Sequence, residues 1–160
     1  MTAAHTQPVI SAAHKGAWKP EIIAFCCNYC AYAAADLAGA QRMQYPPNVL
    51  VVHSPCTGKI EMEHILAAFE KGIDGVLVAG CLEGGCHFIE GNLRAKHRIE
   101  HIRGILEEIG IGAERLRMVN LSAAMAPTFV ERVREIVDTV ARLGPNPLNA
   151  STGKGSGALS

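Results

Sequence analysis

The sequence lacks net charge, long apolar runs and a signal peptide, and each absence excludes a class of protein. Fifteen basic residues balance fifteen acidic ones, so the chain offers no positive field for non-specific binding to nucleic acid. No apolar run approaches the roughly 20 residues of a membrane span, and the first 20 residues do not have the pattern of a signal peptide. We therefore expect a cytoplasmic protein with no nucleic-acid partner and no membrane insertion.

Two nucleotide-binding motifs are also missing. Neither G-x-G-x-x-G nor G-x-x-x-x-G-K-[ST] occurs, although the glycine-rich stretch AGCLEGGCHFIEGN fills residues 79–92. These motifs form the backbone cradles that hold pyrophosphate and phosphate groups. We therefore do not expect the chain itself to bind a nucleotide.

The composition is sufficient for one globular domain. The chain has 160 residues, of which 49% are hydrophobic and 19% charged, and this is enough apolar material for a single core. Residues 1–20 show no periodicity, and residues 144–160 are rich in Gly, Ser, Asn and Pro, as flexible tails are. We predict an N-terminal extension at 1–20, a folded domain at 21–143 and a flexible C-terminal tail at 144–160.

Within the domain, short apolar runs alternate with segments of helical periodicity. The runs at 21–25, 48–53, 75–80 and 116–121 are predicted strands, and the segments at 30–40, 61–72, 91–110 and 127–144 are predicted helices. The first three runs are almost continuously apolar, as are parallel strands covered on both faces. The predicted fold class is α/β, a small open parallel sheet of about four strands in a flavodoxin- or Rossmann-like three-layer arrangement.

All six cysteines follow the predicted strands. Cys26, Cys27 and Cys30 follow the first strand, Cys56 the second, and Cys81 and Cys86 the third. The carboxyl ends of parallel strands share one edge of the sheet, where such folds bind their ligands. In a reducing compartment, clustered thiols are metal ligands or redox groups more often than disulfides. We predict that four thiolates from this edge bind zinc or an iron–sulfur cluster, and that Cys26 packs in the core.

Three other interpretations remain open from the residues alone. A zinc ion could staple a structural interaction module, and the C-x-x-C pair of Cys27 and Cys30 could be a thiol oxidoreductase site. The helix at 91–110 carries a basic face, which is either solvated or a docking surface for a partner. Its basic residues are Arg94, Lys96, His97, Arg98 and Arg103.

Several spaced blocks resemble the delta, iron–sulfur subunits of methyl-viologen-reducing hydrogenases. They are CCNYCAYAAADLAGAQRMQYPPNV, PCTGKIE, GVLVAGCLEGGCHFIEGNLRAKHRIEHIRGIL and GAERLRMVNLSAA, and together they span about residues 21–143. The resemblance implies an electron-transfer subunit of an oxidoreductase complex, with one [2Fe–2S] cluster and no substrate chemistry of its own. It also implies a partner, an FAD-containing subunit of the heterodisulfide reductase A type in an electron-bifurcating complex. Hydrogenase, formate dehydrogenase or other oxidoreductase subunits would supply the electrons.

The same resemblance implies the site residues. The matching cysteines are Cys27, Cys30, Cys56, Cys81 and Cys86, so five candidates compete for four ligand positions. We favour Cys30 as the spare thiol because Cys27 lies nearer the strand end, although a C-x-x-C pair can also hold one metal.

Overall fold

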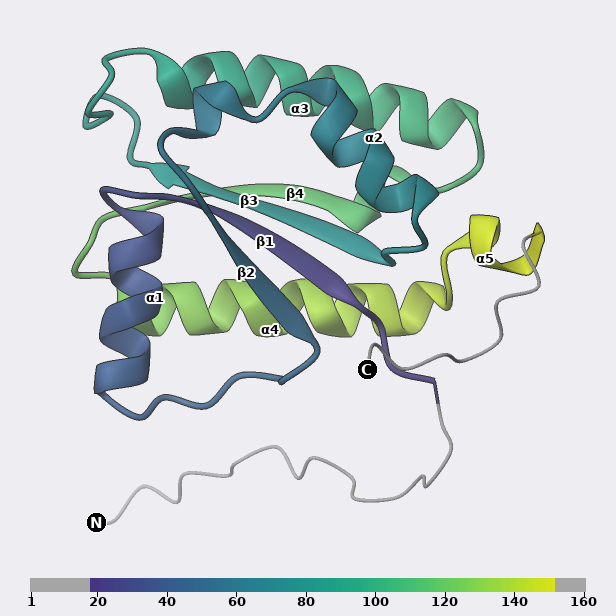
Figure 1. Cartoon of the computed structure of the whole chain (residues 1–160), viewed down its shortest axis with the longest axis horizontal. Coiled ribbons are helices and arrows are strands. Elements are labelled where there is room, and N and C mark those ends of the chain that lie inside the picture. The colour runs from purple at the N-terminus through teal and green to yellow at the C-terminus, as the bar shows by residue number, and fades with distance from the viewer. Residues whose placement is uncertain (1–17, 152–160) are drawn as a thin grey trace, which may run out of the picture.

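The computed structural model describes residues 18–151, and these form a three-layer α/β domain (Figure 1). The strands are β1 (Ile22–Cys27), β2 (Val49–Ser54), β3 (Gly75–Cys81) and β4 (Leu116–Leu121). The α-helices are α1 (Ala31–Ala40), α2 (Met62–Glu70), α3 (Gly91–Glu108), α4 (Ala126–Leu143) and α5 (Pro147–Ser151). Two 3-10 helices, η1 (Thr57–Lys59) and η2 (Ala113–Arg115), complete the chain order.

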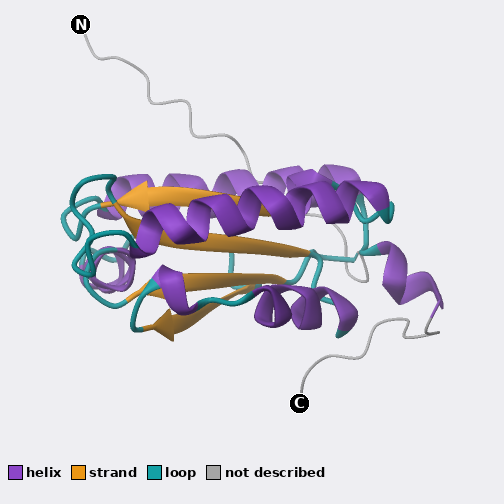
Figure 2. Ribbon diagram, turned by 90° about the horizontal axis from the view of Figure 1, so that it is seen from above, coloured by secondary structure: helices purple, strands orange, loops and turns teal. Residues whose placement is uncertain are grey.

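All four strands are parallel, and their spatial order is β2-β1-β3-β4. The strand arrowheads point to the end of the molecule where several loops gather (Figure 2). The chain leaves β1 for α1 on one face of the sheet and leaves β3 for α3 on the other face (Figure 1). The order therefore reverses between β1 and β3, and this switch point is where open α/β sheets form a ligand crevice. The predicted fold class is confirmed.

Each face of the sheet has its own core. The helices α1 and α4 cover one face and α2 and α3 cover the other (Figure 1). Small side chains at Ala31, Ala34 and Ala38 are fully buried and let α1 approach the sheet and α4 closely. Every residue of β3 is buried, as the continuous apolar run predicts for a central strand.

Glycines end two of the helices, as the sequence predicts. Gly72 follows α2 with a φ of 98°, and Gly144 follows α4 with a φ of 83°. Side chains with a Cβ rarely adopt this left-handed region, so glycine is favoured where a helix must stop and turn. None of the helices in residues 18–151 has the length and apolar character that crossing a bilayer requires.

The segment after α4 packs on the domain, which corrects the tail boundary expected at 144. Asn146 is 1% exposed, and its backbone N–H donates to Asp74 Oδ1 at 2.7 Å. The other carboxylate oxygen of Asp74 accepts from the N–H of Glu21 at 2.9 Å. Arg115 donates to the carbonyls of Asp74 and Pro145 at 3.0 and 3.1 Å. This polar network holds the segment between α4 and α5 at the amino edge of the sheet. The remaining parts of the predicted tails, residues 1–17 and 152–160, lie outside the described residues.

We expect Asp74→Ala to destabilise the fold because it removes the acceptor of two backbone N–H groups. Leaving buried donors unpaired costs about 1–3 kcal/mol for each group, so the free energy of unfolding should fall by about 2–6 kcal/mol. Urea denaturation measures the change. The control is Asp138→Ala, since Asp138 is exposed on α4 and its loss should change the free energy by less than about 0.5 kcal/mol. Equal effects of the two substitutions would contradict this role of the network.

Candidate metal centre

The five predicted thiols lie at the carboxyl edge of β1, β2 and β3. Cys27 and Cys81 are the last residues of β1 and β3. Cys30 is the N-cap of α1, and Cys56 is the N-cap of η1 just after β2. Cys86 lies in the loop between β3 and α3. All six cysteines of the chain are free thiols in the structure.

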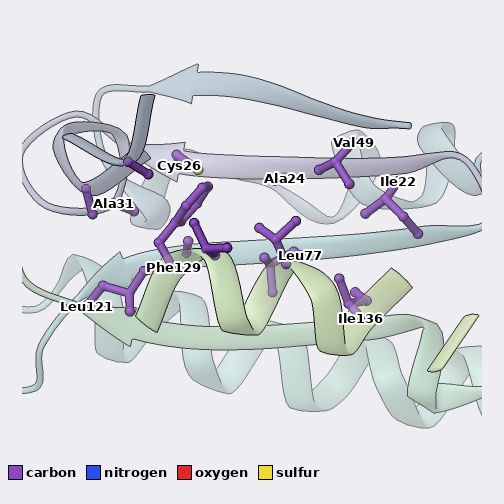
Figure 3. Close-up of a cluster of buried hydrophobic side chains, with 14 of the residues drawn as sticks. Ile22, Ala24, Cys26, Ala31, Val49, Leu77, Leu121, Phe129 and Ile136 are labelled. Atoms are coloured by element: carbon purple, nitrogen blue, oxygen red, sulfur yellow. The ribbon is translucent and has the colours of Figure 1, made fainter. Parts of the chain in front are cut away.

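The sixth cysteine is packed in the core, as the sequence predicts. Cys26 is fully buried in the core between the sheet and the helices α1 and α4, near Phe129 and Ala31 (Figure 3). Cys27 and Cys81 belong to the same buried cluster, so Cys26 lies beside the thiol edge while it packs among apolar side chains. Burial raises the pKa of Cys26 to about 12, and it therefore stays a neutral packing group.

The first thiol pair joins β1 to β3 across the switch point. Cys27 Sγ lies 3.6 Å from Cys81 Sγ. Two sulfurs bound to one metal at about 2.3 Å in a tetrahedron would be about 3.8 Å apart, so this separation suits a shared metal. Cys30, at the N-cap of α1, packs against the buried cluster that contains Cys27 and Cys81.

The second pair joins the loop after β2 to the loop before α3. A Cβ placed on Gly91 would meet both Cys56 Sγ and Cys86 Sγ, so the two sulfurs lie side by side at the start of α3. Within residues 18–151, no three Cys, His, Asp or Glu side chains converge where a single metal ion could sit. The thiols are arranged as two neighbouring pairs.

Backbone N–H groups point toward these sulfurs. The N–H of Ala31 donates to Cys27 Sγ at 3.4 Å, and the N–H of Gly58 donates to Cys56 Sγ at 3.4 Å. Such donors stabilise negative charge on a thiolate and on any cluster bound to it. The start of each following helix therefore contributes to the site.

The thiol of Cys86 differs from the others in its ionisation. Burial would raise its pKa, but backbone N–H groups of Asn92, Phe88 and Gly91 outweigh this effect and hold the pKa below its usual value. These donors belong to the first turn of α3 and the loop before it, where the helix dipole also favours an anion. Burial is the main reason why the pKa of Cys27 and Cys56 is raised and that of Cys81 reaches about 11.

A close backbone contact brings the second pair together. A Cβ added to Gly58 would lie 2.9 Å from the Cα of Gly91, and a Cβ added to Gly91 would collide with Cys56 Sγ. The same added atom would lie 3.4 Å from Cys86 Sγ. Only glycine leaves room for the sulfurs at the start of α3, so the backbone itself forms one wall of the thiol site.

Arg98 and Asn92 hold the thiol-bearing loops, and sequence reasoning missed both. Arg98 donates to the carbonyls of Gly58 and Ile60 at 3.2 and 2.6 Å and pairs with Glu61 at 3.2 Å. It therefore fastens the Cys56 loop to α3 and is not simply a solvated cation of a basic face. Arg94 on the same helix is 73% exposed in its side chain and pairs only with Glu90 among the described residues.

Asn92 anchors the end of β3 to α3 in a similar way. Its side chain is 1% exposed and donates to the carbonyls of Cys81 and Leu82 at 3.1 and 2.9 Å. The amide of Asn120 at the end of β4 donates to the same Cys81 carbonyl. An asparagine one residue inside a helix, directly after a Cys-containing loop, is the sequence signal that could have indicated this anchor.

An aromatic group covers the loops beside the first pair. The rings of Tyr29 and His87 stack with centroids 3.7 Å apart and an interplanar angle of 14°, and Phe88 packs edge-on against both. Tyr29 and Phe88 are 44% and 52% exposed. The residue Ile89, which follows, has a φ of 67° and is 81% exposed. The thiol edge therefore has an apolar surface on its solvent side.

Known proteins similar to this chain are iron–sulfur subunits. Residues 22–144 match the family model described as "Methyl-viologen-reducing hydrogenase, delta subunit". The D-type iron-sulfur subunit of the vhu F420-non-reducing hydrogenase of Methanocaldococcus jannaschii is 50% identical over 131 residues, which are 82% of this chain and 98% of the relative. The D-type iron-sulfur subunit of the F420-non-reducing hydrogenase of Archaeoglobus profundus is 44% identical over 128 residues, covering 80% of this chain and 93% of the relative.

A different kind of relative contains the domain as a small segment. The A-type subunit of the Ferredoxin/F(420)H(2)-dependent CoB-CoM heterodisulfide reductase of Methanosarcina acetivorans is 42% identical over 126 residues. The match covers 79% of this chain but 16% of that relative. The same domain therefore occurs alone and as part of a much longer chain.

We expect Gly91→Ala to disturb the second thiol pair, because the new methyl group must displace Cys56 Sγ. Overpacking of this kind costs about 1–3 kcal/mol, which urea denaturation would show as a lower free energy of unfolding. The matched control is Gly104→Ala in the same helix, where an added Cβ meets nothing within 4 Å. This control should stabilise the protein by about 0.5–1 kcal/mol, because alanine favours the helix. Stabilisation by both substitutions would contradict the crowded geometry at Gly91.

The pKa directions predict an order of thiol reactivity. In metal-free protein at about pH 8, iodoacetamide should alkylate Cys86 before Cys81 and Cys26, since a lower pKa leaves more reactive thiolate at a given pH. Mass spectrometry of peptides at increasing reaction times measures the order. The control is the same protein in concentrated urea, where the three thiols should react at similar rates. Rapid labelling of Cys26 in the folded protein would disagree with its burial.

Proposed function

This chain belongs to the family of methyl-viologen-reducing hydrogenase delta subunits, and from this membership we propose that it is an electron-transfer subunit holding one [2Fe–2S] cluster. Relatives of the chain are subunits of hydrogenase and heterodisulfide reductase. Such a cluster supplies one-electron transfer when it is bound. The observation that carries the proposal is the arrangement of the thiols at one edge of the sheet, with Cys27 against Cys81 and with Cys56 and Cys86 side by side at Gly91.

The thiol pairs suit this cluster better than they suit a single zinc ion. A structural zinc site needs four donors around one point, whereas a [2Fe–2S] cluster divides its four cysteines between two irons. We propose Cys27 and Cys81 as the ligands of one iron, and Cys56 and Cys86 as the ligands of the other. The edge supplies more than four thiols, and backbone N–H groups donate to Cys27 and Cys56, so the donor set present fits the group.

The surrounding residues have their own tasks in this proposal. The N–H donors to Cys27, Cys56 and Cys86 reduce the negative charge on the sulfurs, and such hydrogen bonds raise the reduction potential. Arg98 and Asn92 keep the loops in place. Cys27, Cys56 and Cys81 are each less than 10% exposed, so the protein limits the access of water to three of the proposed ligands.

The partner that we propose is an FAD-containing subunit of the heterodisulfide reductase A type. Support comes from relatives that are A-type subunits of heterodisulfide reductases, in which a matching segment is 16% of the chain. A domain that is covalently joined to a protein in some organisms commonly docks to the corresponding protein in others. The electrons would come from a hydrogenase or another oxidoreductase, and the complete assembly would perform flavin-based electron bifurcation.

The C-x-x-C oxidoreductase interpretation receives less support from the geometry. The thiol of Cys27 contacts Cys81 on a neighbouring strand at 3.6 Å. Its own pKa is raised, chiefly by burial, whereas an attacking thiol in such enzymes has a lowered pKa. The pair is therefore poorly suited to thiol–disulfide exchange.

Anaerobic purification tests the cluster directly. We expect about two irons and about two acid-labile sulfides per chain, and an EPR signal after reduction with dithionite. Replacement of Cys27, Cys56, Cys81 or Cys86 by Ser should reduce the iron content severely, because each change removes one proposed ligand.

The control for these variants is Cys26→Ala, which removes a thiol from the core and not from the edge. Its iron content should equal that of the unchanged protein. Stoichiometric zinc without iron in the unchanged protein would refute the proposal, and full iron content in a ligand variant would remove that residue from the proposed set.

A further inference from the structure

The chain makes a strained turn at Ile89, between Cys86 and the start of α3. The N–H of Glu90 donates to the carbonyl of Phe88 at 2.7 Å, and Ile89 between them has a φ of 67°. A hydrogen bond of this span around a residue with positive φ forms a γ-turn of the rare, strained kind. Among residues 18–151, Ile89 is the only β-branched residue with a positive φ, a region that β-branched side chains fit poorly.

The side chain at the tip of this turn is also exposed. Ile89 is 81% exposed, and the neighbouring Phe88 is 52% exposed. The domain alone therefore gains little apolar burial from an isoleucine here. Glycine would form the same turn without strain, and the surrounding segment already has glycine at positions 84, 85 and 91. A side chain that is both strained and exposed indicates an interaction outside the domain.

A groove of about 630 Å³ adjoins the turn and carries an uncompensated positive charge. Its apolar lining includes Pro55, Phe88 and Ile89. Its charged lining consists of three cations and two carboxylates, Lys59, Arg94, Arg98, Glu61 and Glu90. The carboxylates pair with the two arginines at 3.2 and 3.5 Å. Lys59 is exposed and has no ion pair within residues 18–151, so it is available to a carboxylate of another protein.

We propose that the turn at Ile89 and the adjoining groove form the docking surface for the FAD-containing subunit of the heterodisulfide reductase A type. Ile89 inserts into an apolar socket of that subunit, and Lys59 faces one of its carboxylates. This inference rests on the proposed function, since it assumes that the chain exchanges electrons with that subunit. It goes further because it assigns the contact surface and the chemistry of the surface that covers it.

The position of the turn supports this partner. The N–H of Ile89 donates to the carbonyl of Cys86 at 3.0 Å, and Cys86 is a proposed ligand. A protein that covers Ile89 therefore lies directly against a metal-binding loop, as an electron-transfer partner must. The charge of Lys59 adds the requirement for an acidic group, because complementary charges guide association and fix orientation. Relatives in which a matching segment belongs to an A-type subunit favour that subunit over other oxidoreductases.

The experiment compares Ile89→Gly and Ile89→Asn with the unchanged protein. Glycine and asparagine both tolerate a positive φ and keep the backbone N–H, so these variants remove the apolar tip without removing the turn. The probe is the purified A-type subunit, with its FAD, from the organism that encodes this chain. Anaerobic titration calorimetry measures its dissociation constant, iron analysis the cluster content, and urea denaturation the unfolding midpoint. The matched control is Ile109→Gly, because Ile109 is 59% exposed at the other end of α3 and has a φ of −87°.

We expect both Ile89 variants to bind the A-type subunit about tenfold or more weakly, as loss of a central interface residue does. Their iron content should be unchanged, and neither should have a lower urea midpoint, because little burial is lost and strain is relieved. Ile109→Gly should bind as the unchanged protein does.

The charge on the groove has its own measurement. Lys59→Glu should lower the association rate constant at low salt. Its control is Lys71→Glu, just after α2, which should leave that rate constant unchanged. Equal rate constants for the two variants would contradict the role of Lys59.

The contrary results are distinct. Unchanged affinity in both Ile89 variants, an equal loss in Ile109→Gly, or a lower urea midpoint in both Ile89 variants would overturn the docking surface. Self-association that the Ile89 variants abolish would identify a second copy of the chain as the occupant instead. Failure of the unchanged, iron-loaded protein to bind the A-type subunit would defeat the proposed partner and this inference but leave the cluster in place. Absence of iron from the unchanged protein would defeat the proposed cluster and this inference with it.

Discussion

The backbone contact between Gly58 and Gly91 determines how the thiol edge is built. It brings the loop after β2 against the first turn of α3, and no Cβ fits between them. Cys56 and Cys86 come from segments that are far apart in the sequence, and this contact places them together. Arg98 reinforces it by donating to the carbonyl of Gly58. The N–H groups of the same helical turn then lower the pKa of Cys86. The first turn of α3 therefore determines both the packing and the electrostatics at the second pair.

The two ends of the sheet have different roles in the fold. At the amino edge, Asp74, Arg115 and Asn146 form a buried polar network with partners for its donors and acceptors. At the carboxyl edge, the thiols are held by loops and helix starts. Because the amino edge stabilises the fold, the residues at the carboxyl edge can be chosen for the chemistry of a site and contribute less to stability. Part of the loop network, such as the hydrogen bonds of Asn92, nevertheless fixes the positions of the sulfurs.

The sequence was sufficient to predict the four strands, the helices α1 to α4 and the edge at which the thiols lie, but not α5. Of the four apolar runs, the one that became β3 is buried along its whole length, as a central strand covered on both faces requires, whereas β2 at the edge of the sheet is partly exposed. The order of the strands was not predictable from these runs, since it depends on pairing between distant segments. The interactions of Asn146 and Arg98 were missed for the same reason. Each side chain bonds to carbonyls far away in the chain, while its own neighbourhood in the sequence has the composition of a tail or a solvated helix.

The ligand set itself stays a prediction. The structure places all five candidate thiols at one edge and buries Cys26 completely in the core beside them, and this much follows from the position of each cysteine relative to a strand end. The choice between Cys27 and Cys30 depends on side-chain distances of a few ångströms. Two cysteines separated by two residues can both reach a site, so spacing alone does not distinguish them.

The packing of α5 has a consequence for how the domain can be joined to other chains. Residue 18 leads into the amino end of β1, and the segment from Asn146 into α5 is fastened at the same amino edge (Figure 1). Both ends of the described part of the chain therefore lie on the side opposite the thiols. A further domain could be joined at either end without redesign of the thiol-bearing loops, and the match to a segment of a much longer heterodisulfide reductase chain illustrates such a joined form.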